Sequence, residues 1–302
     1  MITFDNNVSD YLKFFWHTIP HLQAPVLMKI HSISKVLALP LIVAALAILY
    51  YTWNTSQRLS VYIFIPVILL VVLYVFHGPL DHGWLKKFPV PLDPKLGEWL
   101  SRYFRPYAEM QELERQSFDQ RMMLYLDGRL FQSVGSEMRE VPEDIKCMVA
   151  AHGVHMTSNY KDYLIGEYDR VFLYKHPFPT PNHPFLHTVE VNHEDGVIIL
   201  SLEQLTKAVL YPSDYFNIGY YAYGLAFMDV HKQIAFPDCQ NTWMKIEDIT
   251  GWSREKITGV TGMEVMDLTA VHISVFFTHK AQYRSVLPSL ATAWDKIFPA
   301  SS

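Results

Sequence analysis

The strongest constraint on this chain of 302 residues is a pair of uncharged apolar runs near its N-terminus. The first covers residues 36–53 (VLALPLIVAALAILYYTW) and the second covers residues 59–76 (LSVYIFIPVILLVVLYVF). About 20 apolar residues cross a hydrocarbon core of roughly 30 Å, and the usual range begins near 17. Because only residues 54–58 separate the two runs, the pair predicts a transmembrane helical hairpin over 36–76 rather than two buried core helices.

The residues in and around the runs agree with this prediction. Pro40 and Pro66 lie inside the runs, and membrane helices tolerate proline better than soluble helices do. Aromatic side chains that suit the headgroup level gather at the ends of the runs: Tyr50, Tyr51, Trp53, Tyr74 and Phe76. A cleaved signal peptide is disfavoured, because the first run begins about 35 residues into the chain and a second run follows at once.

Basic residues near the runs predict the orientation of the hairpin. Lys29 and Lys35 precede the first run, only Arg58 lies between the runs, and Lys86, Lys87 and Lys95 follow the second. The positive-inside rule then places both termini in the cytoplasm, in a multi-pass arrangement. The N-terminal segment, residues 1–35, is expected to be cytoplasmic or interfacial. Within it, residues 11–16 either lie along the membrane surface or form a short helix packed on its own domain.

Composition excludes several classes of protein. Hydrophobic residues make up 50% of the chain and charged residues 18%, against about 25% charged in a typical soluble chain, so the protein is not intrinsically disordered. The net charge of −5 argues against a nucleic-acid partner. Two cysteines, Cys147 and Cys239, give neither a disulfide framework nor a C-x-x-C pattern.

The rest of the chain divides into a connector and a globular domain. Residues 77–106 contain many prolines, which predict an extended, semi-rigid connector. Residues 107–302 have the composition of an ordinary globular domain. Hydrophobic spacing predicts helices over 109–127, 142–156, 213–229, 262–278 and 283–297, and short strands over 171–174, 188–191 and 197–200. Helices flanking a small sheet make an α+β domain.

Histidines are the first candidates for chemistry, since the chain has fourteen. His152 and His155 share one face of a predicted helix, but apolar neighbours favour a packing role over metal binding. His176, His183 and His187 lie in a proline-rich loop, where a metal-binding cluster is the alternative to ordinary loop histidines. The sequence contains no G-x-G-x-x-G, P-loop, G-x-S-x-G or H-E-x-x-H motif.

Several motifs, in order, resemble the Mlc titration factor A family of bacterial zinc peptidases. GVIILS from residue 196, followed by PSDYFNIG from residue 212, resembles the strand and approach that lead into the family's H-E-F-A-H metal-binding helix. EVPEDIKCMVAAHGVHMT, HTVE and LTAVHISVFF resemble further family segments, so the likeness spans about residues 107–298. The resemblance implies a zincin-like helical domain with a small sheet, attached by the hairpin to the bacterial cytoplasmic (inner) membrane.

The metal site departs from the family pattern. The family uses two histidines one helical turn apart as zinc ligands, the glutamate between them to activate water, and a downstream acidic ligand. The matching positions here are Tyr221, Ala222, Leu225 and Asp267. Since one carboxylate cannot hold zinc against water, the resemblance implies a pseudopeptidase with no metal, no cofactor and no catalytic residue.

Aromatic residues replace the lost ligands on the same predicted helix. Tyr220, Tyr221, Tyr223 and Phe227 read as core packing, with Gly224 allowing close approach of a neighbouring helix. A sharper hypothesis is that the filled cleft, lined by Tyr220, Tyr223, Phe227 and His272, recognises a partner or an apolar ligand. Asp267 is then expected to pair with His272 or His231.

These observations predict a membrane-anchored, catalytically inactive protein that acts through protein–protein binding. Its partners would be the lipid bilayer and a membrane-complex or regulatory protein, for which it serves as an accessory subunit or scaffold. One alternative is a hydrolase that uses a different constellation, His176, His183 and His187 with Asp267. Another is a lipid-facing assembly factor that does not need its globular domain.

Overall fold

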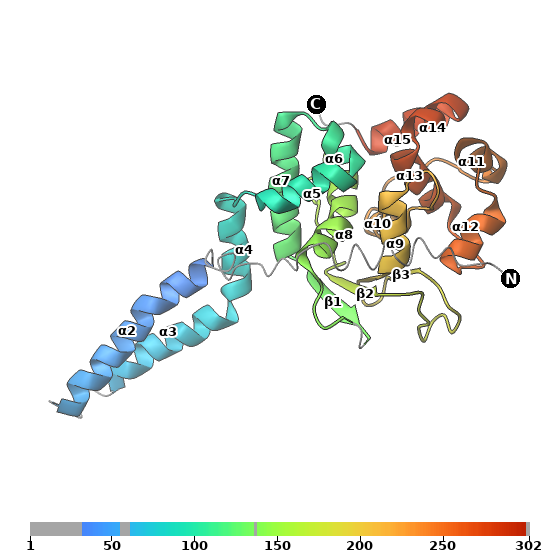
Figure 1. Cartoon of the computed structure of the whole chain (residues 1–302). Coiled ribbons are helices and arrows are strands. Elements are labelled where there is room, and N and C mark those ends of the chain that lie inside the picture. Colours follow the sequence, from blue (N-terminus) through green and yellow to red (C-terminus); the bar gives the residue numbers. More distant parts are fainter. Residues whose placement is uncertain (1–31, 55–60, 136–137, 300–302) are drawn as a thin grey trace. The chain divides into compact units, whose positions relative to one another are not determined.

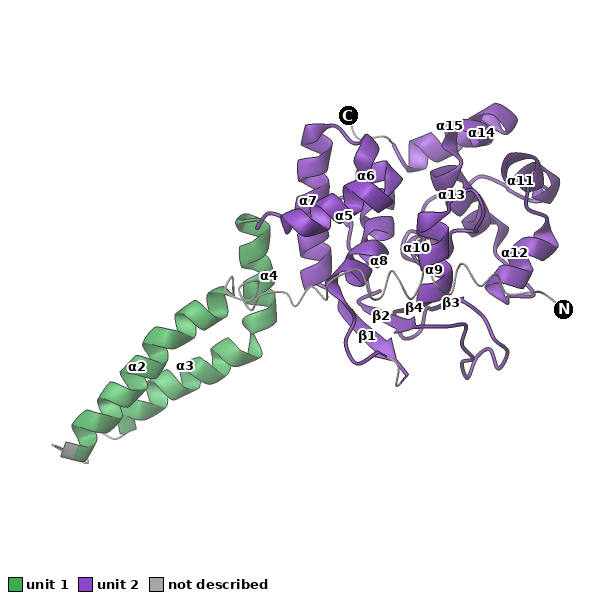
Figure 2. Cartoon of the chain, viewed as in Figure 1, with its two compact units in different colours: residues 1–89 green, residues 90–302 purple. Residues whose placement is uncertain are grey.

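The computed structural model describes residues 32–54, 61–135 and 138–299 (Figure 1). The chain forms two compact units, Met1–Pro89 and Val90–Ser302, here called unit 1 and unit 2 (Figure 2). The predicted interfacial segment at residues 11–16, together with Lys29 and Arg58, lies outside the described residues.

Unit 1 contains three helices in the described part of the chain: α2 (Ile33–Asn54), α3 (Phe64–Val75) and α4 (His77–Lys87). Among the described residues, Ile33–Trp53 is the one single helix long and apolar enough to cross a membrane. The second apolar run is different, because Val61–Val75 bends by 68° into α4 and reaches the length of a span only if both segments are taken together. The structure therefore shows one or two apolar helices near the N-terminus.

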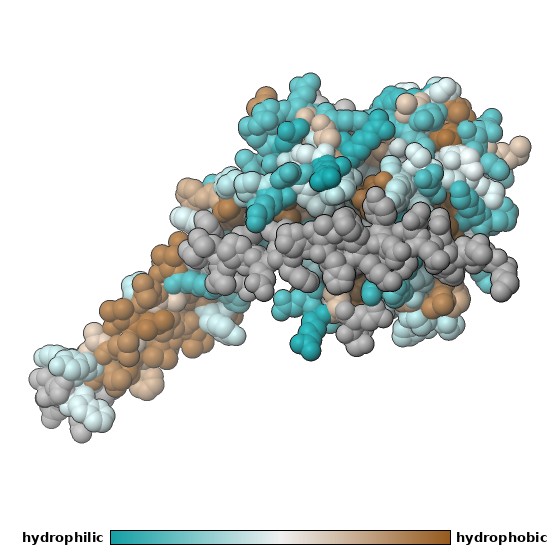
Figure 3. Space-filling model, viewed as in Figure 1, coloured by the Kyte–Doolittle hydropathy of each residue, from teal (hydrophilic) through white to brown (hydrophobic). Residues whose placement is uncertain are grey.

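Helices α2 and α3 pack side by side and leave most of their apolar side chains exposed (Figures 1 and 3). In α2 only Ser34 and Thr52 are buried, whereas Leu39, Leu46 and Trp53 are more than half exposed. A helix that is apolar on all sides is stable in a protein core or in lipid. In the described part of unit 1 few side chains cover α2, so α2 is a candidate for a membrane anchor or a signal sequence.

A carboxylate on α4, Asp81, caps the N-terminal end of α2. Asp81 Oδ1 accepts a hydrogen bond from the backbone N–H of Ser34 at 2.9 Å. Its Oδ2 accepts from the hydroxyls of Ser34 at 2.8 Å and Ser32 at 2.6 Å. An acidic group at a helix N-terminus is favourable because it pairs with free N–H groups and with the positive end of the helix dipole. These bonds fix α4 against the start of α2.

The prediction of an extended connector over residues 77–106 is wrong. This stretch holds α4, α5 (Pro94–Tyr103) and the start of α6 (Arg105–Glu109). Pro94 and Pro106 stand in the first helical turn, where a missing N–H group costs nothing, and Asp93 caps α5 by accepting from Lys95 N at 2.9 Å. Unit 2 accordingly begins near residue 90 rather than 107, with Leu92, Leu96, Leu100 and Phe104 among its core residues.

Unit 2 contains a mixed sheet of four strands: β1 (Leu130–Val134), β2 (Arg170–Tyr174), β3 (Val189–Asn192) and β4 (Val197–Ser201). The strand order is β1-β2-β4-β3, with β1, β2 and β4 parallel and the edge strand β3 antiparallel to β4. The predicted strands β2, β3 and β4 are confirmed, whereas β1 was not predicted. The mixture of this sheet with many helices confirms the α+β class.

Nine helices come after α6 in the described part of unit 2. They are α7 (Glu112–Asp127), α8 (Glu143–Met156), α9 (Leu202–Leu210), α10 (Ile218–Val230), α11 (Trp243–Thr250), α12 (Arg254–Thr261), α13 (Leu268–Thr278), α14 (Lys280–Val286) and α15 (Pro288–Ile297). The predictions of α7, α8, α10 and α13 are confirmed. The single helix expected over 283–297 is broken at Pro288, and α9, α11 and α12 were not predicted.

Helix α10 packs against both α8 and α13, so it lies at the centre of unit 2. Two glycines allow the close contacts. A Cβ atom at Gly153 of α8 would lie 2.8 Å from the ring of Tyr223, and one at Gly224 would lie 3.3 Å from Ile273 of α13. The prediction that Gly224 allows a neighbouring helix to approach is confirmed. This central helix carries most of the candidate site residues.

Candidate functional site

Three of the four positions selected for their resemblance to a zinc site lie on α10, and the fourth, Asp267, contacts one of them. The Tyr221 hydroxyl accepts a hydrogen bond from the backbone N–H of Asp267 at 3.2 Å, although 46 residues separate the two. Asp267 caps α13, since its carboxylate accepts from Ala270 N at 3.0 Å. Ala222 is buried beside Tyr221, and Leu225 is half-buried one turn further along.

The groups at these positions do not fit a zinc ion. Burial raises the pKa of Tyr221 to about 12, and the nearby charge of Asp267 adds to this effect, whereas the hydrogen bond from the Asp267 backbone N–H opposes it. The phenol therefore stays protonated at neutral pH. Alanine and leucine have no donor atom, which leaves the Asp267 carboxylate alone. Zinc sites in proteins use three or four nitrogen, sulfur or oxygen ligands. Within the described residues, no group of three histidine, cysteine or acidic side chains is placed to bind a metal ion.

His152 and His155 of α8 belong to a buried aromatic cluster rather than to a ligand pair. His152 Nδ1–H donates to the Met148 carbonyl at 2.9 Å, and its Nε2 accepts from the Asn217 amide at 3.1 Å. The Tyr220 hydroxyl is hydrogen-bonded to His155 Nδ1 at 2.6 Å, and the Tyr220 ring stacks on Phe277 at 5.0 Å. Burial lowers the pKa of His152 to about 4 and, with the charges of Lys280 and His152, that of His155 to about 3. Both imidazoles are therefore neutral packing groups at pH 7.

The other aromatic side chains of α10 also lie in the interior. Tyr223 Oη accepts a hydrogen bond from the Tyr125 hydroxyl of α7 at 2.9 Å, and Phe227 stacks on His231 at 4.2 Å. Tyr220, Tyr223 and Phe227 are at most 2% exposed. Their interpretation as core residues is thus confirmed. A partner would reach them only if the core rearranged.

His272 of α13 takes part in a directed chain of hydrogen bonds. The Thr242 hydroxyl donates to the Cys239 carbonyl and therefore accepts from His272 Nε2–H at 2.7 Å. His272 Nδ1 then accepts from the Tyr283 hydroxyl at 2.6 Å, which itself accepts from Trp294 Nε1–H at 2.9 Å. Burial lowers the pKa of His272 to about 4. This chain ties α13, α14 and α15 together.

The expected pairing of Asp267 with His272 or His231 is wrong. His272 is bonded to Thr242 and Tyr283, and His231 Nδ1 is bonded to the carbonyl of Phe227 at 3.0 Å. The Asp267 carboxylate is exposed and serves as the N-cap of α13. A cap explains this aspartate without any histidine partner, because its side chain satisfies a free N–H of the first helical turn.

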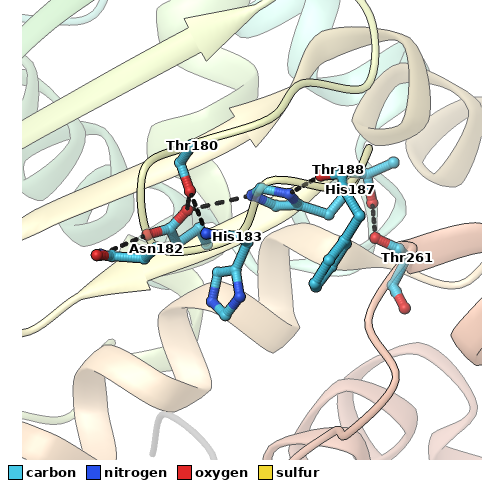
Figure 4. Close-up of polar contacts among 8 residues, drawn as sticks. Thr180, Asn182, His183, His187, Thr188 and Thr261 are labelled. Atoms are coloured by element: carbon cyan, nitrogen blue, oxygen red, sulfur yellow. Dashed lines mark hydrogen bonds and ion pairs between the residues drawn. The ribbon is translucent and has the colours of Figure 1, made fainter.

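The proline-rich loop between β2 and β3 holds the second polar site, here called the Glu190 cluster (Thr180, Asn182, His187 and Glu190; Figure 4). The Glu190 carboxylate accepts from the Thr180 hydroxyl at 2.6 Å, from the Asn182 amide at 3.2 Å and from His187 Nε2–H at 3.1 Å. His187 Nδ1 lies 2.9 Å from the Phe185 carbonyl. The imidazole of His187 thus lies between two oxygen atoms, the Phe185 carbonyl and the Glu190 carboxylate.

The four residues of the alternative hydrolase constellation have different partners. His176 pairs with Glu203 at 2.8 Å, and Asp267 caps α13. Only the rings of His183 and His187 lie together, with centroids 5.4 Å apart. Both nitrogens of His187 are already bonded, so neither is free to take a proton from a nucleophile.

Sequence reasoning missed the partners of His187. Glu190 entered only as the end of the HTVE segment, without a role of its own, and Thr180 and Asn182 were not selected, because each looks by itself like an ordinary loop residue. The signal was a charged residue inside the run Val189-Glu190-Val191, where one strand face is buried. A buried carboxylate needs partners, and the adjacent loop was the place to look for them.

Replacing Glu190 with leucine is expected to destabilise unit 2 by about 2 kcal/mol, since it leaves the buried His187 imidazole and the half-buried Thr180 hydroxyl without their acceptor. Glu194→Leu is the matched control, because Glu194 is exposed on the turn after β3 and should change stability by no more than about 0.5 kcal/mol. Urea unfolding of the full chain in mild detergent, followed by tryptophan fluorescence, gives both values. Equal losses of unfolding free energy in the two variants would show that the hydrogen bonds of Glu190 do not stabilise unit 2.

Searches with this chain found no matching protein family, no matching curated protein and no matching solved structure. The likeness to the Mlc titration factor A family therefore stays a prediction from the order of its motifs.

Proposed function

We propose that this protein is a membrane-anchored binding protein of the bacterial cytoplasmic membrane, a pseudopeptidase that serves as an accessory subunit or regulatory scaffold. The observation that carries the proposal is α2, an apolar helix of 22 residues with most of its side chains exposed. At 1.5 Å per residue, its apolar part Ile33–Trp53 extends about 32 Å, enough to cross a hydrocarbon core.

The two ends of unit 1 support the proposed orientation. The hydrogen bonds of Asp81 hold α4 at the N-terminal end of α2, so Ser32 before α2 and α4 after α3 lie at the same end of the helix pair. Lys35, Lys86 and Lys87 are exposed at this end. By the positive-inside rule this end faces the cytoplasm, where unit 2 would also lie.

The groups around α10 support binding rather than zinc-dependent hydrolysis. Tyr221, Ala222 and Leu225 stand where the resembled family has two ligands and a general base, and Asp267 caps a helix. A hydrolase built on the loop histidines remains the second candidate, since His187 and Glu190 form a buried contact. It has less support, because both nitrogens of His187 are bonded and His176 and Asp267 have other partners.

Membrane attachment is tested first, by washing isolated membranes with carbonate and then extracting them with mild detergent. The full chain is expected to resist carbonate and to dissolve in detergent. Aspartate costs roughly 3 kcal/mol at the centre of a membrane helix, so the double variant Val43→Asp/Leu46→Asp should appear largely in the carbonate wash. Val265→Asp, at an exposed position of unit 2, should behave as the wild type.

Binding is tested on the tagged full chain purified in the same detergent. We expect a membrane protein to co-purify in stoichiometric amount and zinc to be far below one ion per chain. A chain that purifies alone contradicts the accessory-subunit proposal, and stoichiometric zinc contradicts the pseudopeptidase proposal. Release of the wild type by carbonate contradicts the anchor.

A further inference from the structure

Helix α4 presents an apolar stripe that the described residues of unit 1 leave partly exposed. Leu80 and Trp84 lie one turn apart on α4, and Phe88 follows at the same interval where the helix ends. The three side chains are 42%, 40% and 47% exposed. The rings of Trp84 and Phe88 lie 4.3 Å apart, so they form one continuous surface.

The opposite side of α4 is turned toward α2. Asp81 is bonded to Ser32 and Ser34 at the start of α2, and His82 and Leu85 are half-buried. The stripe is therefore not free to rotate into the helix pair, since rotation would break the three hydrogen bonds of Asp81. The arrangement within unit 1 fixes the stripe outward.

Lysines surround the stripe. Lys86 and Lys87 are exposed in the last turn of α4, and Lys87 Nζ lies 5.6 Å from the centre of the Phe88 ring. Lys35 is exposed at the start of α2, the end against which α4 packs. Basic side chains beside tryptophan and phenylalanine are typical of helices that lie in the headgroup layer of a membrane.

The polarity and direction of α4 favour the membrane surface over the hydrocarbon core. It carries His77, Asp81, His82, Lys86 and Lys87 in eleven residues, whereas α3 before it is apolar throughout. The 68° bend turns α4 away from the axis of Val61–Val75. A basic helix with an apolar stripe, set at this angle to an apolar helix, suits the membrane surface.

We infer that α4 is an interfacial helix that binds anionic phospholipid, with the Leu80–Trp84–Phe88 stripe at the acyl boundary and Lys35, Lys86 and Lys87 against phosphate. This inference rests on the proposed membrane anchor. Each lysine close to an anionic surface favours anionic over neutral lipid roughly five-fold. Lys86 and Lys87 together should therefore enrich anionic lipid around α4 by more than ten-fold.

Depth is measured on the full chain reconstituted in phosphatidylcholine vesicles, with a fluorophore on one introduced cysteine. Gly83→Cys labels α4, where an added Cβ meets nothing within 4 Å, and Leu69→Cys labels α3. The native Cys147 and Cys239 are buried and stay unlabelled. Lipids brominated near the headgroup should quench the label at 83 best, and lipids brominated near the chain end should quench the label at 69 best.

The outcomes separate this inference from the proposed anchor. If the label at 69 is quenched and the label at 83 is not, α4 is not interfacial and the inference fails while the anchor stands. If neither is quenched, the anchor itself fails. Equal quenching of the label at 83 by both lipids also overturns the interfacial depth.

Lipid class is tested with the same label at 83 and with phosphatidylglycerol or phosphatidylcholine carrying identical brominated chains. We expect several-fold stronger quenching per brominated lipid from phosphatidylglycerol. Lys86→Gln/Lys87→Gln should abolish most of this difference, whereas Lys86→Arg/Lys87→Arg and the unit 2 control Lys161→Gln should keep it. Equal quenching by the two lipids in the wild type, or an unchanged preference in the glutamine variant, overturns the inference.

Discussion

Alanine at position 262 is expected to destabilise unit 2 by more than about 3 kcal/mol, whereas alanine at position 251 should cost about 1 kcal/mol. Both glycines end a helix in the left-handed conformation, with φ of 72° at Gly262 and 71° at Gly251. Both variants therefore carry the same backbone strain, which is roughly 1–2 kcal/mol for a residue with a Cβ atom. They differ in the space around that atom.

The surroundings of Gly262 leave no room for a side chain. An added Cβ would lie 2.2 Å from the Leu186 carbonyl oxygen and 2.8 Å from His187 Cα, both of them backbone atoms. The Glu190 cluster holds this part of the loop through His187, and Thr188 N donates to the Thr261 carbonyl at 2.9 Å. The loop cannot retreat without losing those bonds. At Gly251 an added Cβ meets nothing within 4 Å.

Urea unfolding of the two full-length variants in mild detergent measures the difference directly. Gly262→Ala should also expose the loop that contains His187, so limited proteolysis within residues 175–188 should become faster than in the wild type. Equal losses for Gly262→Ala and Gly251→Ala would show that the contact with the loop carries no energy. A large loss of stability in Gly262→Ala with an unchanged rate of proteolysis would show that the substitution disturbs a part of unit 2 other than this loop.

Local sequence patterns were sufficient where one element carried its own signal. The β-branched run 197–200 and the apolar helix of α8 were predicted close to their observed bounds, because alternation and helical spacing are read within a few residues. The apolar run of α2 was predicted for the same reason. The bend between α3 and α4 was not, since it depends on Asp81 reaching the start of α2 from the next helix.

Elements without a clear period were missed. Strand β1, Leu-Phe-Gln-Ser-Val, has little alternation of its own and is defined by its parallel pairing with β2. Helix α9 follows β4 without a loop, so no turn residue marks its start. In residues 77–106 the prolines were read as helix breakers, whereas Pro94 and Pro106 begin helices, the one helical position that proline favours.

The site depended on contacts between distant residues. Motif order placed Tyr221 and Asp267 in one region, and the structure joins them by a hydrogen bond. The partners of His272 could not be predicted, because Thr242 and Tyr283 lie on other helices and no spacing relates them. Each ring nitrogen of a buried histidine needs a hydrogen-bond partner, and tertiary packing decides which residue supplies it.

Unit 2 is expected to lose several kcal/mol of stability as the pH falls from 6.5 to about 4.5. His152 and His272 are buried and His155 is half-buried, all three as neutral imidazoles, and loss of solvent lowers their pKa values to about 4, 4 and 3 from the ordinary value near 6.5. Burial also lowers the pKa of His279. Between these values and 6.5, the unfolded chain binds protons that the folded chain does not.

The sign follows from that difference in bound protons. Lowering the pH favours the state that binds more protons, so it favours unfolding, and the full stability is present only above pH 6.5. Each pKa unit corresponds to about 1.4 kcal/mol, so each of the three histidines contributes roughly 2–3 kcal/mol by pH 4.5. The sum approaches the whole stability of an ordinary domain, which is about 5–15 kcal/mol.

The measurement is the free energy of unfolding of the full chain in mild detergent between pH 7.5 and 4.5, with one matched pair of variants. His152→Gln replaces a buried imidazole with a neutral amide. It should reduce the number of protons taken up on unfolding by about one, and so reduce the slope of the unfolding free energy against pH, whatever it does to stability at pH 7.5. Ile273→Val changes a buried core side chain that has no titratable group, so it should lower the stability and leave the slope as it is in the wild type. A stability independent of pH over this range, or the same flattening in both variants, would show that the buried histidines are not held neutral. Because His152 and His155 join α8 to α10 while His272 joins α13 to α14, a steep loss confirms that the aromatic interior around α10 is one cooperative core.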